Sequence, residues 1–238
     1  MEPLYPVART VFWAPLTFGL RWTIEGAQVI PPHGPAILAS NHSSYLDPLI
    51  LAFLADRRHR RVRFLAKDEL FDKRGLGPLL RGIRQIPVRR GTSDAAEALR
   101  PAVEDLGRGE CVTVFPEGTI SLDLEPMAGK TGTARLAQAS GVPVTPVGMW
   151  GAHRIMFKGR KPRWRAGIAE TISVGPPMRI DPDEDVHEAT DRIMEAICAQ
   201  VARARELYPQ SPQPGEGDWW VREPSSAQLR SCQHEETA

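Results

Sequence analysis

A histidine and an aspartate stand five residues apart in the segment ILASNHSSYLDPLILAFLA, residues 37–55. An imidazole acts as a general base near neutral pH when a carboxylate fixes its tautomer and stabilises the imidazolium. His42 follows an apolar run that reads as a buried strand, and Asp47 opens an apolar run that reads as a helix. Two interpretations stay open: a turn through Ser43 and Ser44 folds the carboxylate onto the ring, or the aspartate caps the helix.

Further polar residues follow other expected strands, where α/β sheets commonly bind ligands. Arg89 and Arg90 come late in the segment IPVRRG at 86–91, and a guanidinium there can hold a phosphate through two hydrogen bonds. The segment FPEGT at 115–119 supplies a carboxylate, a glycine and a hydroxyl after a strand. It is either a plain turn or a second group of site residues at the same sheet edge.

The elements that must position these residues alternate between strands and helices. Such alternation is typical of an α/β sheet with helices packed against it. Strands are expected at 35–40, 61–67, 84–90, 111–119, 143–151 and 169–178, and helices at 47–56, 75–83, 92–110, 129–142 and 186–208.

The composition fits one domain, at residues 25–208, with an addition at each end. The chain of 238 residues is 42% hydrophobic, which suffices for one sizeable core. Residues 1–24 are rich in aromatic side chains and suit an amphipathic helical segment at a membrane interface, or a helix packed on the domain. Residues 209–238 read as a flexible tail, in which Trp219 and Trp220 either dock on the body or touch a membrane.

The charge pattern argues against nucleic acid as a partner. The net charge is only +1 at pH 7, and no recognised nucleic-acid motif accompanies the basic runs at 57–63 and 158–165. These runs still permit attraction to anionic lipid or phosphate. The N-terminus lacks the features of a signal peptide, and Pro6, Arg9 and Pro15 interrupt it as a membrane span.

Several short segments in a fixed order resemble the four motif blocks of the glycerophospholipid acyltransferases, the 1-acylglycerol-3-phosphate O-acyltransferase family. Each segment alone is weak, but their joint order is specific, and the resemblance covers most of the chain. It implies a mixed, mostly parallel central sheet flanked by helices. The segments are NHSSYLD at 41–47, AKDELF at 66–71, IPVRRG at 86–91, FPEGT at 115–119 and VPVTPV at 142–147.

The resemblance implies roles for the histidine and the aspartate. His42 takes the proton from an acceptor hydroxyl, which attacks the thioester of acyl-CoA or acyl carrier protein, and Asp47 orients the imidazole. The acyl group therefore passes directly to the acceptor. No metal and no other cofactor is expected.

The resemblance also implies a set of substrate-binding residues. The arginine that usually follows the FPEGT block is replaced by Ile120, so Lys130 or Arg135 is a candidate substitute. Family members often carry an aspartate before the second-block arginine, where this chain has a second arginine. The implied substrate-binding residues are Arg89, Arg90, Glu117, Gly118, Thr119 and Lys130.

The preferred hypothesis is an acyltransferase that moves a fatty acyl group to the free hydroxyl of lysophosphatidic acid and gives phosphatidic acid. We expect it on the cytoplasmic face of the membrane, as a peripheral or monotopic protein. Because of Ile120, another lysophospholipid, an acylated amino-acid lipid or a glycolipid stays open as the acceptor. A non-catalytic lipid-binding protein and a thioesterase are the alternatives from other classes.

Overall fold

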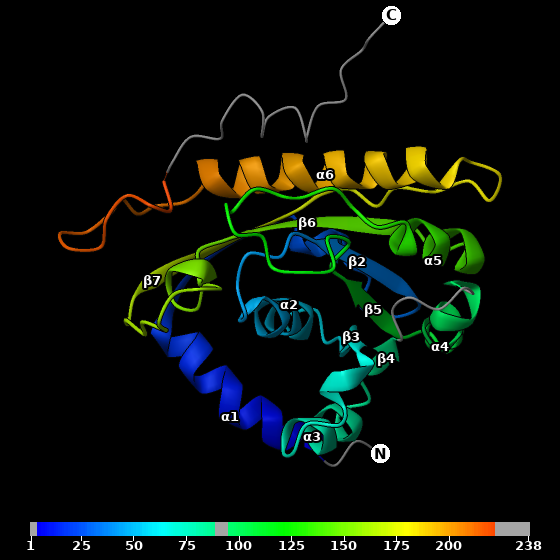
Figure 1. The fold of residues 1–238 in the computed structure, drawn as a ribbon, viewed down its shortest axis with the longest axis horizontal. Helices are drawn as coiled ribbons and strands as arrows, with labels where there is room; N and C mark the ends of the chain where they lie inside the picture. The colour runs from blue at the N-terminus through cyan, green and yellow to red at the C-terminus, as the bar shows by residue number, and fades with distance from the viewer. Residues whose placement is uncertain (1–3, 89–94, 222–238) are drawn as a thin grey trace, which may run out of the picture.

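A seven-stranded sheet forms the centre of the computed structural model, which describes residues 4–88 and 95–221 (Figure 1). The strand order is β1-β7-β6-β2-β5-β3-β4. Neighbouring strands run parallel except β6 and β7, which pair antiparallel. The expectation of a mixed, mostly parallel sheet is therefore confirmed.

Three of the strands are buried along their whole length, namely β2, β6 and β7. Such strands need cover on both faces of the sheet, which explains their nearly continuous apolar runs. All strands except β1 correspond to predicted ones. Their bounds are β1 (Leu20–Glu25), β2 (Ala36–Ser40), β3 (Val62–Lys67), β4 (Ile86–Val88), β5 (Cys111–Val114), β6 (Val144–Trp150) and β7 (Ile168–Val174).

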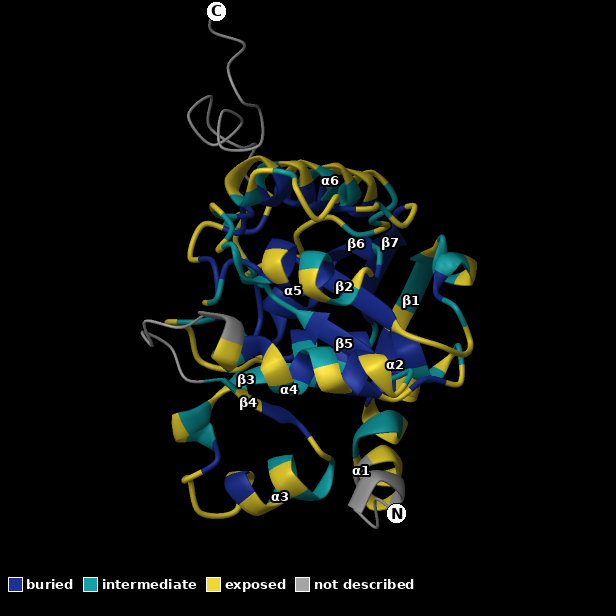
Figure 2. Cartoon of the chain, turned by 90° about the vertical axis from the view of Figure 1, so that its right-hand side faces the viewer, coloured by how far each residue is buried: buried dark blue, intermediate teal, exposed yellow. Residues whose placement is uncertain are grey.

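Helices supply the cover on both faces, and the central strands between them, such as β5 and β6, appear dark blue in Figure 2. Along β2, Ile37 and Ala39 join the core on the side of α4, α5 and α6, whereas Ala36 and Leu38 join the core on the side of α1 and α2. The two-residue period of a strand produces this division. The helices are α1 (Leu4–Gly19), α2 (Asp47–Asp56), α3 (Leu76–Gly82), α4 (Ala95–Gly107), α5 (Gly132–Ser140) and α6 (Val186–Glu206).

The N-terminal segment is part of the sheet as well as a helix. Residues 20–25 form β1, an edge strand in parallel pairing with β7, so the expected domain boundary at residue 25 falls inside a strand. α1 is fastened to α2, because Trp13 Nε1 donates to Asp56 Oδ2 at 2.8 Å. The sequence analysis did not predict β1, because the short apolar run of this strand follows the helical pattern of α1 with no turn between them.

One side of α1 exposes apolar side chains to solvent. Val7 and Val11 are more than half exposed, and Phe18 is 86% exposed. Their spacing places all three on one face of the helix. Across the described residues, no helix combines the length and the apolar character that crossing a membrane requires.

The beginning of the expected tail packs on the body through Trp219 and Trp220, which is the docked alternative that the sequence left open. Trp220 is 1% exposed, and its ring lies 4.1 Å from the guanidinium of Arg154. Two nitrogens of Arg154 also donate to the Glu216 carboxylate, at 2.8 and 2.7 Å. One buried arginine thus fixes a segment whose composition resembles a linker. Residues 222–238 lie outside the described part of the chain.

Candidate active site

The turn between β2 and α2 brings the predicted histidine and aspartate together. His42 Nδ1 lies 2.9 Å from Asp47 Oδ2. The backbone N–H groups of Ser43 and Ser44 donate to the same oxygen, each at 2.7 Å. The Asp47 side chain is 1% exposed and that of His42 is 16% exposed. The carboxylate is therefore held from three sides, and one edge of the imidazole reaches solvent.

The helix-cap interpretation of Asp47 is wrong. α2 begins with Asp47 itself, and the capping position is taken by Leu46, which makes no side-chain cap hydrogen bond. The carboxylate accepts N–H groups that precede the helix, and not those of its first turn. Its place at the helix N-terminus still favours the negative charge, because the helix dipole is positive there.

The hydrogen bond to Asp47 determines what the imidazole can do. A carboxylate is an acceptor, so the neutral His42 ring carries its proton on Nδ1 and presents the lone pair of Nε2. The ring stacks on Phe115 at 4.2 Å with an interplanar angle of 19°. This contact fixes the ring plane without competing for either nitrogen. The pair has the arrangement of a general base and the group that orients it.

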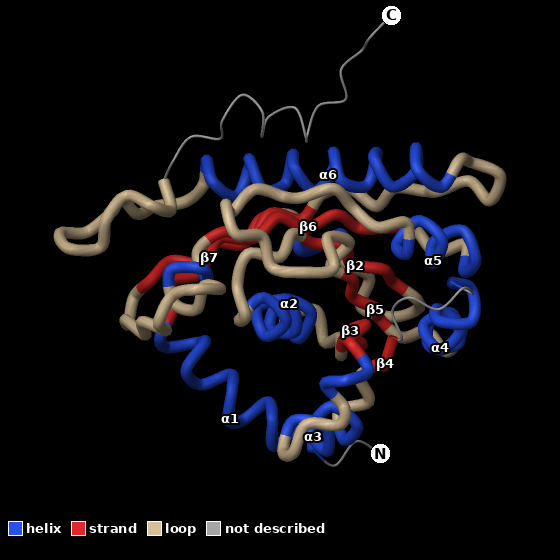
Figure 3. Tube along the Cα trace, viewed as in Figure 1, coloured by secondary structure: helices blue, strands red, loops and turns tan. Residues whose placement is uncertain are grey.

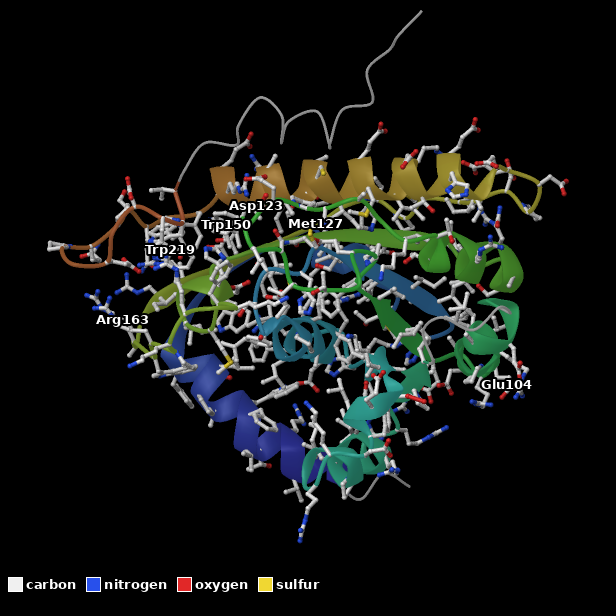
Figure 4. The ribbon with its side chains drawn as sticks, in the orientation of Figure 1. Glu104, Asp123, Met127, Trp150, Arg163 and Trp219 are labelled. Carbon is white, nitrogen blue, oxygen red and sulfur yellow. The ribbon has the colours of Figure 1, made fainter. Side chains whose placement is uncertain are left out.

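Glu117 lies behind the histidine and does not point to solvent. Its Oε1 accepts from the His42 backbone N–H at 2.7 Å, and its Oε2 accepts from that of Met127 at 3.1 Å. Met127 is labelled in Figure 4, in the loop between β5 and α5. Burial raises the pKa of Glu117 to about 8, against the opposing effect of these two N–H groups. These two hydrogen bonds of Glu117 hold the loop that carries His42 against the loop that carries Met127.

Further hydrogen bonds join the loops that follow β2, β5 and β6, drawn in tan in Figure 3. The Ser121 N–H donates to the His42 carbonyl at 2.8 Å, and Ser44 Oγ donates to the Met156 carbonyl at 2.7 Å. Asn41 spans two strands, since its side chain donates to the Met149 carbonyl and accepts from the Met149 N–H. The sequence contained Asn41 in a motif but gave it no role.

Two lysines lie beside the turn at Gly118 and Thr119. Gly118 has φ of 70°, and a Cβ there would lie 3.1 Å from Lys130 Nζ, so the turn needs glycine and the ammonium lies against it. Lys158 Nζ lies 3.5 Å from Thr119 Oγ1. Lys158 belongs to a basic run that predicted attraction to anions but no place in the site. Two cationic side chains therefore flank the FPEGT turn.

The other predicted anion-binding residues have different outcomes. Ile120, which stands where family members usually have an arginine, is buried, so this position offers no polar group to a substrate. Arg135 is exposed on α5, where its Nε donates to Thr131 Oγ1 at 3.3 Å. Arg89 and Arg90 lie outside the described residues. Of the two substitutes considered for the missing guanidinium, Lys130 is the one beside the turn.

A third acidic group, which sequence reasoning missed, is buried at the same end of the sheet. Glu170 on β7 is fully buried, and a Cβ on Gly151 would lie 2.7 Å from its Oε2. Burial raises the pKa of Glu170 well above its usual range, and the nearby negative charge of Asp47 adds to this effect. Burial therefore favours the neutral form of this carboxyl. Its one sequence signal is an acidic residue inside an apolar strand.

The residues described here include no group of three or more His, Cys, Asp or Glu side chains that could hold a metal ion. The candidate site thus consists of the His42–Asp47 pair, the buried Glu117 behind it, and two lysines beside the turn at Gly118. This arrangement can take a proton from a bound hydroxyl and can attract an anionic substrate.

Comparison with known proteins relates this site to a family. The family model described as Acyltransferase matches residues 21–150, which is more than half of the chain and includes His42, Asp47 and Glu117. The crystal structure of the 1-acyl-sn-glycerophosphate acyltransferase PlsC from Thermotoga maritima is similar in fold, with a TM-score of 0.64 and 29% sequence identity. That match covers 86% of this chain and 84% of the other.

Curated relatives carry related names. A chloroplastic 1-acyl-sn-glycerol-3-phosphate acyltransferase of Arabidopsis thaliana is 29% identical over 176 residues, which cover 73% of this chain and 48% of the relative. The human 1-acyl-sn-glycerol-3-phosphate acyltransferase alpha is 30% identical over 186 residues, covering 76% and 63%. The chain thus spans about half to two thirds of the length of these relatives. By its matched domain, its fold and its motif residues, the chain belongs to the Acyltransferase family.

Proposed function

We propose that the protein transfers a fatty acyl group from a thioester donor to the free hydroxyl of lysophosphatidic acid, giving phosphatidic acid. The observation that carries this proposal is the 2.9 Å contact between His42 Nδ1 and Asp47 Oδ2, with part of the imidazole open to solvent. The names of the relatives and of the similar crystal structure support lysophosphatidic acid as the acceptor. The donor is acyl-CoA or acyl carrier protein.

The geometry supports a direct transfer. Nε2 of His42 takes the proton of the acceptor hydroxyl while its oxygen attacks the thioester carbonyl, and the carbon–oxygen bond forms. The carbon–sulfur bond then breaks, and the imidazolium returns the proton to the departing thiolate. Asp47 stabilises the imidazolium between these two proton transfers. The reaction consumes no water and leaves the enzyme unmodified.

The contacts of the Ser44 hydroxyl support a transfer without an acyl-enzyme at that serine. Ser44 Oγ donates to the Met156 carbonyl at 2.7 Å and accepts from the Leu46 N–H at 3.1 Å. A nucleophilic serine needs its hydroxyl proton directed at the base. The hydroxyl proton of Ser44 is instead directed at a backbone carbonyl, so the acceptor hydroxyl is the attacking group.

Lys130 and Lys158 are the proposed contacts of the acceptor phosphate. They flank the turn at Gly118 and Thr119, where the usual arginine is replaced by a buried isoleucine. A lysine binds phosphate as a point charge and lacks the fixed fork of arginine. We therefore expect looser selection of the headgroup, and other lysophospholipids, acylated amino-acid lipids and glycolipids stay alternative acceptors.

A peripheral position on the cytoplasmic face of a membrane is part of the proposal. The exposed face of α1 carries Val7, Val11 and Phe18, and the end of α1 packs against half-exposed Trp164, whose ring would lie 2.7 Å from a Cβ on Gly19. Figure 4 shows the neighbouring Arg163 on the same side of the molecule. Apolar and aromatic side chains beside basic ones suit an interface with anionic lipid.

The test is release of free thiol from oleoyl-CoA and palmitoyl-CoA by the purified chain, with and without lysophosphatidic acid, together with product analysis. We expect release that depends on the acceptor, and loss of about 10²–10⁴-fold in rate in His42→Ala, because the general base is removed. His187→Ala, at an exposed position of α6, is the matched control and should retain the wild-type rate.

Three other outcomes would contradict the proposal in different ways. Thiol release that ignores the acceptor would assign a thioesterase. No release with any acceptor of a panel, but normal lipid binding, would assign a non-catalytic lipid-binding protein. A wild-type rate in His42→Ala would remove His42 from the mechanism. Thermal unfolding of each variant separates loss of chemistry from loss of fold.

A further inference from the structure

A long irregular segment connects β5 to α5 beside the candidate active site. Residues 115–131 form neither helix nor strand, and Figure 4 shows two of them, Asp123 and Met127, beneath α6. The backbone groups of such a segment must find partners outside the regular ladders of helices and sheets. The position of the segment therefore depends on its contacts with the rest of the molecule.

The part of this segment at residues 121–127 holds His42 through both backbone polar groups of the histidine. The Ser121 N–H donates to the His42 carbonyl at 2.8 Å. The Met127 N–H donates to Glu117 Oε2 at 3.1 Å, and Glu117 Oε1 accepts from the His42 N–H at 2.7 Å. A displacement of the loop 121–127 would therefore move the backbone that carries the imidazole.

One arginine in the last turn of α6 grips the middle of this loop. Arg205 donates to both carboxylate oxygens of Glu125, at 2.7 and 3.0 Å, and to the Leu124 carbonyl at 3.1 Å. Two parallel hydrogen bonds between a guanidinium and a carboxylate fix orientation as well as distance. The side chains of Arg205 and Glu125 are 22% and 11% exposed, so water screens this pair less than a surface pair.

The backbone at the gripped position is strained. Leu124 has φ of 70°, in the left-handed region that leucine seldom adopts, and its side chain is buried. Such a conformation persists only where the surrounding contacts over-determine it. The hydrogen bond from Arg205 to the Leu124 carbonyl is one of these contacts, so the shape of the loop depends on the arginine.

Arg205 is itself held from the other side. Its guanidinium carbon lies 4.0 Å from the centre of the Trp150 ring, at the end of β6. Trp150 is 6% exposed, and its ring packs against that of His153 at 4.4 Å. An arginine over an aromatic face is attracted more strongly where water is excluded. The guanidinium thus forms a rigid bracket between the sheet, α6 and the loop 121–127.

We propose that Arg205 is a positioning residue for the reaction, because it clamps the loop 121–127 and thereby holds His42 where proton transfer requires it. This inference rests on the proposed function, in which His42 is the general base. Misplacement of a reacting group by about 1 Å can cost about 10²-fold in rate. Loss of the clamp should therefore lower the rate of the chemical step and not the affinity for the donor.

The test measures kcat and KM of acyl transfer for Arg205→Gln, Glu125→Gln and the double variant, at a temperature where urea unfolding shows each chain to be folded. We expect kcat to fall at least about tenfold in each single variant, with KM for the thioester nearly unchanged. The double variant should lose little more than Arg205→Gln, because both substitutions break the same contact. Arg205→Lys keeps the charge but not the fork, so it should lose less.

α6 offers a matched control two residues earlier. Arg203 donates to both carboxylate oxygens of Glu25, at 2.8 and 2.9 Å, and this pair joins α6 to the edge strand β1 instead. Arg203→Gln and Glu25→Gln should keep the wild-type kcat. Equal losses of kcat from breaking either pair, or losses that add in the double variant Arg205→Gln/Glu125→Gln, would overturn the proposal.

A second measurement does not depend on turnover. Nuclear magnetic resonance signals of the His42 imidazole are sensitive to its stacking on Phe115, whose ring centre lies 4.2 Å away. We expect these signals to shift in Arg205→Gln and to stay in place in Arg203→Gln. Unchanged signals in Arg205→Gln overturn the proposal. If the wild-type chain transfers no acyl group, the proposed function fails, and this comparison still decides whether Arg205 positions His42.

Discussion

The two ends of the central sheet bury ionisable groups in opposite ways. At the carboxyl ends of β2 and β5, Asp47 and Glu117 are held by backbone N–H groups. At the amino ends of the same strands, Arg60 and Arg63 are held mainly by backbone carbonyls. In both places the connections between strands and helices supply backbone groups that secondary structure leaves unpaired.

The difference between the two ends shows what each can do. At the carboxyl end, Asp47 fixes the tautomer of one partly exposed imidazole, and Phe115 fixes the plane of its ring. At the amino end, the buried arginines donate to backbone carbonyls, so they provide charge and rigidity. The carboxyl end thus presents a partly exposed imidazole, whereas the buried charges at the amino end hold loops together.

The largest expected effect comes from breaking the carboxyl end at Asp47. In Asp47→Asn, the amide oxygen takes the place of Oδ2 and still accepts from the Ser43 and Ser44 N–H groups and from His42 Nδ1. It carries no negative charge, so it orients the imidazole weakly and does not stabilise the imidazolium, and we expect kcat to fall by about 10²–10⁴-fold. Steady-state acyl transfer measures the change. Asp183→Asn, at an exposed position, is the control.

A kcat of Asp47→Asn within a small factor of the wild-type value would show that the carboxylate only shapes the turn. To separate the two roles, unfolding in urea should be measured on the same samples. Loss of activity with an unchanged free energy of unfolding supports orientation of the imidazole, whereas parallel losses of both indicate a structural role.

Substitution of the buried arginine Arg60 at the amino end should lower the free energy of unfolding. Arg60→Met removes the donor to three carbonyls, and we expect the free energy of unfolding to fall by about 3 kcal/mol, since hydrogen bonds from charged groups are the stronger ones. Arg60→Lys keeps the charge but has a single ammonium, which cannot span the three acceptors as the planar fork does. It should therefore restore only part of the loss.

Urea unfolding of Arg60→Met, Arg60→Lys and the exposed control Arg81→Met measures these differences. Full stability in Arg60→Lys would show that charge alone holds residue 60 to the three carbonyls. A loss in Arg81→Met as large as that in Arg60→Met would mean that the three carbonyl bonds are not the cause.

Local pattern predicted the carboxyl end much better than the amino end. The His42–Asp47 pair is close in sequence, so its spacing offered the contact as one of two interpretations, and the family resemblance then implied it. Asn41, Glu117 and Lys158 act through contacts that join residues far apart in the chain. The sequence suggested where the last two lie or what they attract, but not which backbone groups or side chains they meet.

The remaining misses have a common physical cause. β1 pairs with β7, nearly 150 positions away, and the docked part of the tail depends on Arg154, more than 50 positions before it. At the amino end, Arg60 joins the loop before β2 to the loop before β5. Strand alternation and helix periodicity describe neighbours along the chain, so they cannot identify partners that only the folded topology brings together.

The smallest expected effect concerns the neutral acid at the carboxyl end. Burial raises the pKa of Glu170 well above its usual 4.5, so the folded protein keeps this proton to a higher pH than the unfolded chain does. The unfolded state then binds fewer protons, and the free energy of unfolding falls as pH rises above about 4.5. Glu170→Gln cannot ionise and should remove this part of the decline.

We expect Glu170→Gln to match the wild-type chain below pH 4.5 and to exceed its free energy of unfolding increasingly as pH rises above that value. Urea unfolding across that range measures the slope, with exposed Glu188→Gln as the control. Some decline must remain, because the pKa of Glu117 is also raised, to about 8. If Glu170→Gln instead lost stability only near neutral pH, Glu170 would be an ionised group with a cationic partner. The carboxyl end of the sheet would then bury a charged Glu170 near Asp47, and burial would not be what determines its protonation.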